Sequence, residues 1–475
     1  MKVRSVMKAH QMVIFVVAVL FLTLGGAAQQ PGPPAAITVI EGATVIDGVS
    51  SQPIRDAILV IDGDTIRSIG RRGSVTVPAG ARTIRASGKT IMPALFALHT
   101  HLAMSEQWER NKELYTRERL QRDANIYLYY GVEHVVSMGL DWEPMWGFRA
   151  DQRAGRAGGA RVYSAGLGYS AVGGFEPMVP PRESRSSGYP RGVQGVNRPA
   201  NPEEARAMVR KEMVNKPDVQ KIWLDGGQNG QFKKLDPEIY GAIIDEAHKY
   251  NVKVFVHNRG LEDAKELIRR GVDVLGHPVS DKEVDEEFLQ LAKDKRVAQI
   301  LTSAGGYNAA FDDKASYLDD PGVPLLFFPI VLKALRSGKY QEERTAGVQA
   351  ARDRFETAAR STRKIFAKGI PIVMGTDSGS NAAFAGLWEH LEMQAMVKAG
   401  LTPMQAIQAG TLNSARVLGV EKRHGSLEAN KVADFIILTA DPLSDIGNSR
   451  KIEAVWMNGK SVDRAMLAPR RASSD

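Results

Sequence analysis

The hydrophobic pattern divides the chain into two β-rich ends and an alternating middle. Residues 37–92 read as short strands with alternating apolar and polar positions, as in "ITVIEGATVIDG" and "AILVIDGDTIRSIG". The same pattern returns near the C-terminus in "ADFIILTADP" and "AVWMNGKSV". The dipeptides Asp62-Gly63 and Asn458-Gly459 are typical of tight hairpin turns. We therefore expect one small β-sandwich domain that is built from both chain ends.

The middle of the chain repeats a strand followed by a helical segment. Helical stretches such as "PEEARAMVRKEMV" begin near Pro, Asp or Asn. Repeats of this kind predict an α/β fold, here a (β/α)8 TIM-type barrel with its site at the carboxyl ends of the strands. A doubly wound open sheet is the alternative, but no Gly-rich phosphate loop follows the first strand. The predicted strands are 91–99, 132–139, 160–166, 219–226, 252–258, 272–277, 297–304 and 370–377.

The N-terminal segment reads as a secretory signal. A basic start precedes an apolar run over 12–24, and small residues follow up to Ala28. The pattern predicts a secreted or periplasmic protein with no stable membrane insertion after signal cleavage. An uncleaved membrane anchor is the alternative, although a span needs about 20 apolar residues. The predicted order is a signal peptide 1–28, a Pro-rich lead-in 29–36, a first β-sandwich segment 37–92, the barrel 93–419, a second β-sandwich segment 420–466 and a tail 467–475.

Composition narrows the classes of function. The chain has no cysteine, so disulfides cannot stabilise the exported protein and thiolates cannot bind a metal. The formal net charge is +8, without a basic cluster or an aromatic-interleaved basic motif, which argues against a nucleic acid partner. The expected partner is a small-molecule substrate. The sequence leaves the oligomeric state open, including a homo-oligomer.

Polar residues with metal-binding side chains lie at the predicted strand ends. His99 and His101 close the first strand, and side chains at i and i+2 of a strand point to the same side. A lone pair of this kind is also compatible with a surface turn or with hydrogen-bonded core histidines, so further ligands are needed. Those further candidates are Lys221 in the fourth strand, His257 and His277 at the ends of the fifth and sixth, and Asp377 at the end of the eighth.

These motifs together resemble the amidohydrolase superfamily, specifically its imidazolonepropionase-like and prolidase-like branch. The segment "GLTPMQAIQAGTLNSARVLGV" also looks like the return of this family from the barrel to the β-sandwich. The resemblance covers nearly all of the mature chain. The matching pieces are HxH at His99 and His101, "KIW" with Lys221, "VFVHN" with His257, "VLGH" with His277 and "GTDSG" with Asp377.

The resemblance implies a centre with two divalent metal ions. His99, His101 and Asp377 would hold one ion, and His257 and His277 the second. Lys221, carboxylated by CO2, would bridge the two ions, which requires a neutral amine; an ordinary ammonium is the alternative. Zinc is the default for such a set, and manganese, cobalt or iron also fit.

The implied function is that of an exported metal-dependent hydrolase. It would cleave an amide in a non-polymeric substrate, such as a dipeptide or an N-acyl amino acid, by metal-activated hydroxide. Asp377 would be the catalytic residue that moves the proton, with pure ligation as the alternative. A lactone, carbamate, cyclic amide or phosphoester would suit the same centre. A non-catalytic binding protein is a more remote alternative.

The sequence indicates residues that contact the substrate less clearly than it indicates metal ligands. Tyr169, Arg259 and Tyr307 follow the ends of the third, fifth and seventh strands and are candidates. Residues 177–201 form a loop rich in Gly, Pro and Ser that carries arginines, and we interpret it as a lid or as an exposed excursion. Phe175 stands where relatives of the family often carry His, so its surroundings bear on specificity.

Overall fold

The computed structural model describes most of the chain after the predicted lead-in. Two units are distinguished, Met1–Ala35 and Ala36–Asp475. The predicted signal peptide, the lead-in 29–36 and residues 177–195 of the predicted loop lie outside the described residues. Within the described part of the chain, no helix is long and apolar enough to cross a membrane. The described residues are 37–106, 109–110, 115–175, 196–227, 230–312, 315–326, 329–338, 342, 346–379 and 384–468.

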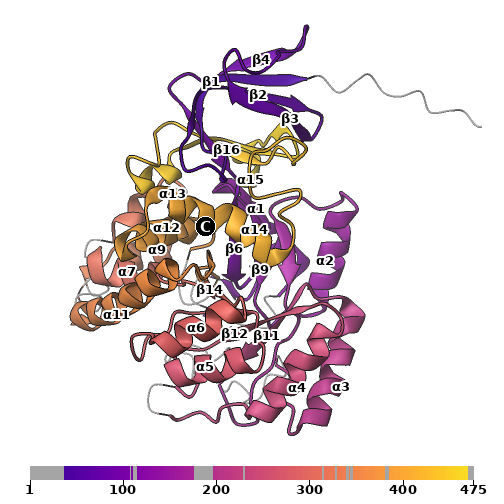
Figure 1. Ribbon diagram of the computed structural model, residues 1–475, viewed down its shortest axis with the longest axis vertical. Helices are drawn as coiled ribbons and strands as arrows, with labels where there is room; N and C mark the ends of the chain where they lie inside the picture. The colour runs from indigo at the N-terminus through magenta and orange to yellow at the C-terminus, as the bar shows by residue number, and fades with distance from the viewer. Residues whose placement is uncertain are drawn as a thin grey trace, which may run out of the picture. The chain divides into compact units, whose positions relative to one another are not determined.

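Strands from both chain ends form one mixed, mainly antiparallel sheet (Figure 1). Its order is β18-β17-β16-β5-β1-β2-β3, and β4 pairs with β1. The predicted hairpins are present, with Gly63 at φ 63° and with Asn458 and Gly459 at φ 52° and 70°. Strands of both chain ends therefore share one sheet. The strands are β1 (Thr38–Val45), β2 (Ile54–Asp62), β3 (Thr65–Arg71), β4 (Arg82–Arg85), β5 (Thr90–Pro93), β16 (Phe435–Leu438), β17 (Ile452–Met457) and β18 (Lys460–Ser461).

The middle of the chain contributes parallel strands at all the predicted places. One sheet has the order β10-β9-β6 and the other β11-β12-β13-β14-β15. The first predicted strand is two strands, because the chain leaves β5 at Pro93 and enters the parallel sheet at Leu95. The strands are β6 (Leu95–Thr100), β9 (Val132–Ser137), β10 (Arg161–Ser164), β11 (Val219–Trp223), β12 (Lys253–His257), β13 (Val274–Leu275), β14 (Ala298–Ile300) and β15 (Ile372–Val373). A short pair, β7 (Ser105–Glu106) and β8 (Glu109–Arg110), stands apart.

Backbone hydrogen bonds connect the two parallel sheets at both of their edges. Beyond β10, the Tyr169 N–H donates to the Lys221 carbonyl of β11 at 2.8 Å. Beyond β15, the Leu98 N–H of β6 donates to the Met374 carbonyl, also at 2.8 Å. The segment after β15 therefore lies beside β6, although the two are far apart in sequence.

Helices separate the strands and cover their outer side (Figure 1). Helices α3 and α4 begin at Pro202 and Pro237, and the side chains of Asn201 and Asp236 accept backbone hydrogen bonds at their N-termini. The helices are α1 (Arg117–Tyr129), α2 (Glu143–Arg153), α3 (Pro202–Glu212), α4 (Pro237–His248), α5 (Leu261–Arg269), α6 (Glu286–Asp294), α7 (Ala304–Phe311), α8 (Val323–Leu326), α9 (Pro329–Leu335), α11 (Val348–Ala367), α12 (Leu387–Ala399), α13 (Pro403–Gln408), α14 (Ser414–Leu418) and α15 (Arg464–Leu467).

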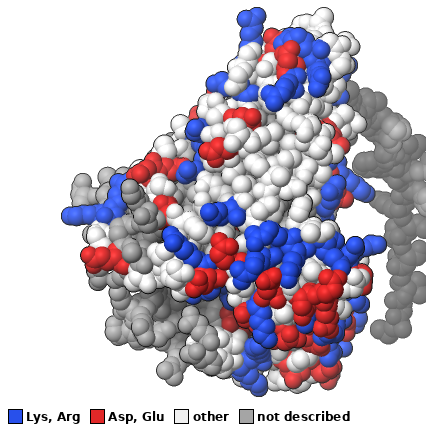
Figure 2. All heavy atoms as spheres, turned by 60° about the vertical axis from the view of Figure 1, so that its left-hand side comes forward, with Lys and Arg blue, Asp and Glu red and all other residues white. Residues whose placement is uncertain are grey.

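Apolar side chains of the parallel strands separate into two clusters. Phe255 packs with Val274 and Ile300 in one cluster, whereas Val254 and Val256 pack in the cluster that includes the helices. Alternate residues of a strand point to opposite faces, so both faces of these strands are buried, as their continuous apolar runs predict. On the surface, acidic and basic side chains lie intermixed over the lower half of the face in Figure 2.

Candidate metal centre

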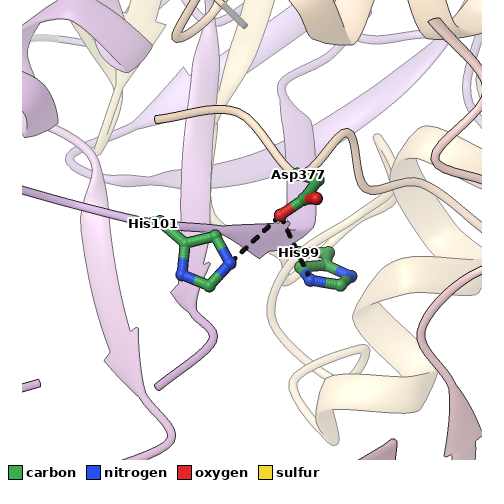
Figure 3. Close-up of side chains that lie close together, drawn as sticks. All are labelled: His99, His101 and Asp377. Carbon is green, nitrogen blue, oxygen red and sulfur yellow. Dashed lines mark ion pairs between the residues drawn. The ribbon is translucent and has the colours of Figure 1, made fainter. Parts of the chain in front are cut away.

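Three of the predicted ligands meet where β6 and the segment after β15 lie side by side. The His101 Nε2 lies 3.0 Å from the Asp377 Oδ1, and the His99 Nε2 lies 3.6 Å from the same oxygen (Figure 3). These three residues offer ligand atoms that all lie within 4.8 Å of one another. Two imidazoles and one carboxylate at this spacing form a donor set that suits a divalent cation such as zinc.

The other predicted ligands lie directly beside this group. The Lys221 Nζ is 3.2 Å from the His99 Nε2. The His277 ring is 4.7 Å from the His99 ring and 4.2 Å from the His257 ring, measured between centroids. The structure therefore brings all six predicted ligand residues together at the carboxyl ends of parallel strands.

The backbone after β15 is shaped to approach the histidines closely. A Cβ at Gly375 would lie 2.7 Å from the His99 Cβ, and one at Gly379 would lie still closer to the His101 carbonyl oxygen. Between them, Asp377 has φ 59°, in the left-handed region that a non-glycine residue adopts at a cost of about 1 kcal/mol or more. This conformation directs the carboxylate toward the two imidazoles, and the contacts around it hold it there.

Burial keeps the imidazoles of His99, His257 and His277 neutral. Burial lowers the pKa of His99 and His277 well below the ordinary value, and the nearby cations Lys221 and Arg259, respectively, lower it further. Burial lowers the pKa of His257 to about 4. A neutral imidazole has a free lone pair, which is the form that binds a metal ion.

The pKa values of the Lys221 amine and of the Asp377 carboxyl are both lowered. Lys221 is fully buried, and burial lowers the pKa of its amine to about 7. Burial alone would raise the pKa of the Asp377 carboxyl, but the hydrogen bond with His101 and the positive charge of Lys221 in its ammonium form act against burial, and the pKa is lowered. The site thus offers an ionised carboxylate beside an amine that is partly neutral near pH 7.

The hydrogen bonds of the histidines leave nitrogens that can bind an ion. The His99 Nδ1 lies 2.9 Å from the Gly276 carbonyl oxygen, so its Nε2 is the nitrogen that faces Asp377. The His277 Nδ1 bonds the Thr302 hydroxyl at 2.6 Å, while its buried Nε2 has no hydrogen-bond partner among the described residues. An unpartnered buried nitrogen is costly, and a bound cation would satisfy it. The donor set therefore fits divalent metal ions.

Sequence reasoning missed Asp225, which holds His257. The Asp225 Oδ2 lies 2.8 Å from the His257 Nε2, and the Asp225 Oδ1 accepts the Gly227 N–H at 2.7 Å. The hydrogen bond from His257 is the main cause that lowers the pKa of Asp225 to about 2. The available signal was its position two residues after β11, at the same end of the sheet as the ligands.

Sequence reasoning also missed Glu389, which lies beneath the segment that carries Asp377. Its Oε1 accepts the hydroxyl of Thr376 at 2.7 Å and that of Ser378 at 3.0 Å. The Tyr127 hydroxyl lies 2.6 Å from the Ser378 hydroxyl. Glu389 anchors both neighbours of Asp377 and so fixes its orientation. The available signal was an acidic residue near the start of the stretch "LWEHLEMQAM", shortly after the predicted strand that ends at Asp377.

A second group of metal-type ligands lies away from this centre, at the amino-terminal end of β9. His134, His424 and Asp434 offer ligand atoms within 4.8 Å of one another. However, the Arg161 Nη1 lies 3.0 Å from the Asp434 Oδ2, and the His424 Nδ1 lies 2.9 Å from the same oxygen. Because a guanidinium already neutralises this carboxylate, we interpret the group as an ion-pair network that needs no cation.

The predicted substrate contacts have different surroundings. Arg259 is exposed beyond the end of β12. Tyr307 lies in α7 and packs against Phe311, with 5.6 Å between the ring centroids. Tyr169 is fully buried, and its hydroxyl has no hydrogen-bond partner among the described residues. Of the three side chains, that of Arg259 is the most accessible.

Comparison with known proteins gives consistent matches over most of the chain. The sequence model of the amidohydrolase family matches residues 90–462. Ochratoxinase of Aspergillus niger is 25% identical over 470 residues, which cover 92% of this chain and 88% of that protein. Imidazolonepropionase of Flavobacterium psychrophilum is 32% identical over 104 residues, 21% of this chain and 25% of that protein. A solved Xaa-Pro dipeptidase with bound methionine has a TM-score of 0.71 and 25% identity, covering 90% of this chain and 100% of that chain.

Proposed function

The chain belongs to the amidohydrolase family and is a hydrolase, and we propose that it cleaves an amide bond of a small, non-polymeric substrate with the help of two divalent metal ions. The observation that carries this proposal is the convergence of four histidines, one aspartate and a buried lysine at one end of the parallel strands. The similarity to a Xaa-Pro dipeptidase supports a substrate of dipeptide or N-acyl amino acid type.

The residues of the centre divide into two ligand groups. His99, His101 and Asp377 would hold one ion, and His257 and His277 the other. Asp225 engages the Nε2 of His257, so the Nδ1 is the ring nitrogen that can face an ion. When bound, divalent ions of this kind polarise a substrate carbonyl and acidify water. Zinc is the expected ion for this donor set.

Lys221 would join the two groups as a carbamate. Its burial supports this role, because a neutral amine reacts with CO2 whereas an ammonium does not. The neutral amine and CO2 would give a carbamate anion and release a proton, so that a carboxylate would stand between the two ligand groups. An ammonium at this place would instead repel divalent ions held by the two groups.

Asp377 is the proposed proton carrier. Its lowered pKa keeps the carboxylate ionised at neutral pH, and its side chain is 28% exposed, so it reaches the solvent side of the centre. It accepts a proton from the attacking water and returns it to the leaving amine. Asp225 orients the His257 ring, and Glu389 orients the segment that carries Asp377.

The eight parallel strands form a closed (β/α)8 barrel. The hydrogen bonds from Tyr169 to Lys221 and from Leu98 to Met374 support closure, since they join the edges of the two parallel sheets. The two apolar clusters support it as well, one within the strands and one toward the helices. Under this proposal, residues 37–92 and 420–466 would together make the β-sandwich domain, and the barrel would span 93–419.

Metal analysis and a substrate screen test the proposal. The purified mature protein, reconstituted with zinc and bicarbonate, is analysed for metal and assayed with N-acyl amino acids, dipeptides and lactones. We expect two ions per chain and turnover of an amide. Protein that binds no metal after reconstitution would contradict the proposal. Turnover of lactones alone would show that the enzyme cleaves an ester bond and not an amide.

A further inference from the structure

Two phenylalanines lie beside the metal centre on the side of His257. The Phe175 ring is stacked on the His257 imidazole, with 5.6 Å between centroids and 23° between planes. The Phe232 ring meets Phe175 edge to face at 5.8 Å and 77°. Both residues are partly exposed. They therefore present apolar surface next to the residues that surround the reacting bond.

Close backbone packing fixes the position of Phe175. The Ser170 hydroxyl donates to the Phe175 carbonyl at 3.0 Å. A Cβ at Gly174 would lie 2.6 Å from the Lys233 carbonyl, so this glycine allows the loops after β10 and β11 to touch. The loop that carries Phe232 therefore packs directly against the loop that carries Phe175.

Phe232 is placed by the same loop that holds His257. A Cβ at Gly227, which has φ 72°, would lie 2.8 Å from the Phe232 ring. The N–H of this glycine is also the donor to Asp225, whose other oxygen engages His257. One short loop therefore sets both the orientation of a ligand imidazole and the position of the second aromatic ring.

The geometry points to an apolar substrate subsite formed by Phe175 and Phe232, which accepts an aromatic or branched aliphatic group of the substrate. This inference rests on the proposed function, because it places the subsite beside the proposed ligand His257. A partly exposed aromatic pair gains most from a second apolar group that removes its rings from water, and aromatic partners add about 0.5–1.5 kcal/mol per pair in general. A charged or small polar group would gain nothing there.

Binding of small acids tests the subsite without any turnover. The Kd of 3-phenylpropanoate and of propanoate is measured by calorimetry on the zinc-loaded protein. We expect the phenyl compound to bind at least about fivefold more tightly. Phe232→Ala and Phe175→Leu should reduce this ratio by about two- to tenfold each, whereas Phe366→Leu, an exposed position at 41%, should leave it unchanged.

Phe232→Ala is the cleaner variant, because Phe175 touches the ligand His257 and Phe232 contacts only Phe175 within the described ring contacts. Metal content is measured for each variant, so a loss of ions is not mistaken for a loss of the subsite. Equal binding of the two acids by the wild type, or an unchanged ratio in Phe232→Ala with full metal content, would overturn the subsite.

A turnover experiment separates this inference from the proposed function. N-acetyl-phenylalanine, N-acetyl-leucine, N-acetyl-alanine and N-acetyl-aspartate are compared by kcat/KM. We expect the first two to be preferred and the preference over alanine to shrink in Phe232→Ala. Hydrolysis of all four at equal rates overturns the subsite while the proposed function stands. Preferential binding of 3-phenylpropanoate without any amide turnover supports the subsite and contradicts the proposed function.

Discussion

At the scale of single residues, Asp377 combines three features that rarely occur together in one aspartate. It has a left-handed backbone conformation, it contacts two buried imidazoles, and its side chain still reaches solvent. Strain of this kind persists only where surrounding contacts enforce it, and it is common at functional sites. The two neighbours that enforce it are Thr376 and Ser378, both bonded to Glu389.

The proposed proton-transfer role of Asp377 can be tested separately from its proposed ligand role. Asp377→Asn keeps an oxygen that can touch the metal, but its amide cannot accept and return a proton at neutral pH. We expect most of the metal to remain and kcat to fall by about 10² to 10⁴ with little change in KM, measured by metal analysis and steady-state kinetics. His99→Asn is the matched comparison and should lose metal instead. Retention of most of the kcat at full metal loading would show that the aspartate is only a ligand.

Lys221 offers a second test at the residue scale. Lys221→Ala removes the group that would carry the carbamate, so both bound metal and activity should be lost. Short carboxylic acids added together with zinc should partly restore both, since they supply a carboxylate in the vacated space. Lys295→Ala, at an exposed position, is the control and should behave as the wild type. A fully active Lys221→Ala protein is incompatible with a bridging lysine.

At the scale of elements, the centre depends on α12 as well as on the strands. Most residues of this helix are buried, and Glu389 lies there with its Oε2 unpartnered among the described residues. Burial raises the pKa of this carboxyl to about 7. The helix therefore supports the segment after β15 through a carboxyl group that stays protonated at mildly acidic pH.

The buried position of Glu389 predicts that the free energy of unfolding of the protein depends on pH. Above pH 4.5 the unfolded chain releases the proton of Glu389, while the folded protein keeps it up to about pH 7. The free energy of unfolding contributed by this group therefore falls as the pH rises through that window, by up to about 3 kcal/mol. In Glu389→Gln the side-chain oxygen still accepts from both hydroxyls, but no charge forms.

Denaturant unfolding at pH 5 to 8 measures the effect. The difference in free energy between Glu389→Gln and the wild type should shift in favour of the variant as the pH rises, and level off above about pH 7. Glu356→Gln, on the exposed side of α11, is the matched control and should show no such trend. A difference that is constant across this range would mean that Glu389 ionises normally in the folded protein.

At the scale of the whole molecule, residues distant in sequence hold the chain together. Strand β5 pairs with β16 over Thr90–Pro93 and Phe435–Leu438, and the Arg464 guanidinium donates to the Tyr129 carbonyl at 2.9 Å. The chain has no cysteine, so no disulfide reinforces these contacts. Cohesion of the described unit therefore rests on sheet pairing, on apolar packing and, under the proposal, on bound metal.

Export is the prediction that concerns the entire chain. We propose that the N-terminal segment is a cleaved signal, because a basic start, an apolar run and small residues follow one another there. Mass spectrometry of secreted material should show a mature N-terminus near Gln29. Recovery of the intact chain beginning at Met1 in a membrane fraction would reverse the assignment.

The sequence by itself determined the element types and the six candidate ligands. The apolar runs of all eight parallel strands, the hairpins at Gly63 and Gly459, and the polar residues at the strand ends are local patterns, so they can be recognised without knowing the fold. Because the carboxyl ends of parallel strands lie together, strand order alone indicated that these residues would meet.

Only the tertiary structure decided how those residues are supported. Asp225, Glu389 and the pair Phe175 and Phe232 contact residues from other elements, and the periodicity of the sequence does not show which elements meet. The protonation states were likewise undetermined before folding, because they follow from burial in the assembled molecule, where removal from water disfavours charge on imidazoles, amines and carboxyls alike.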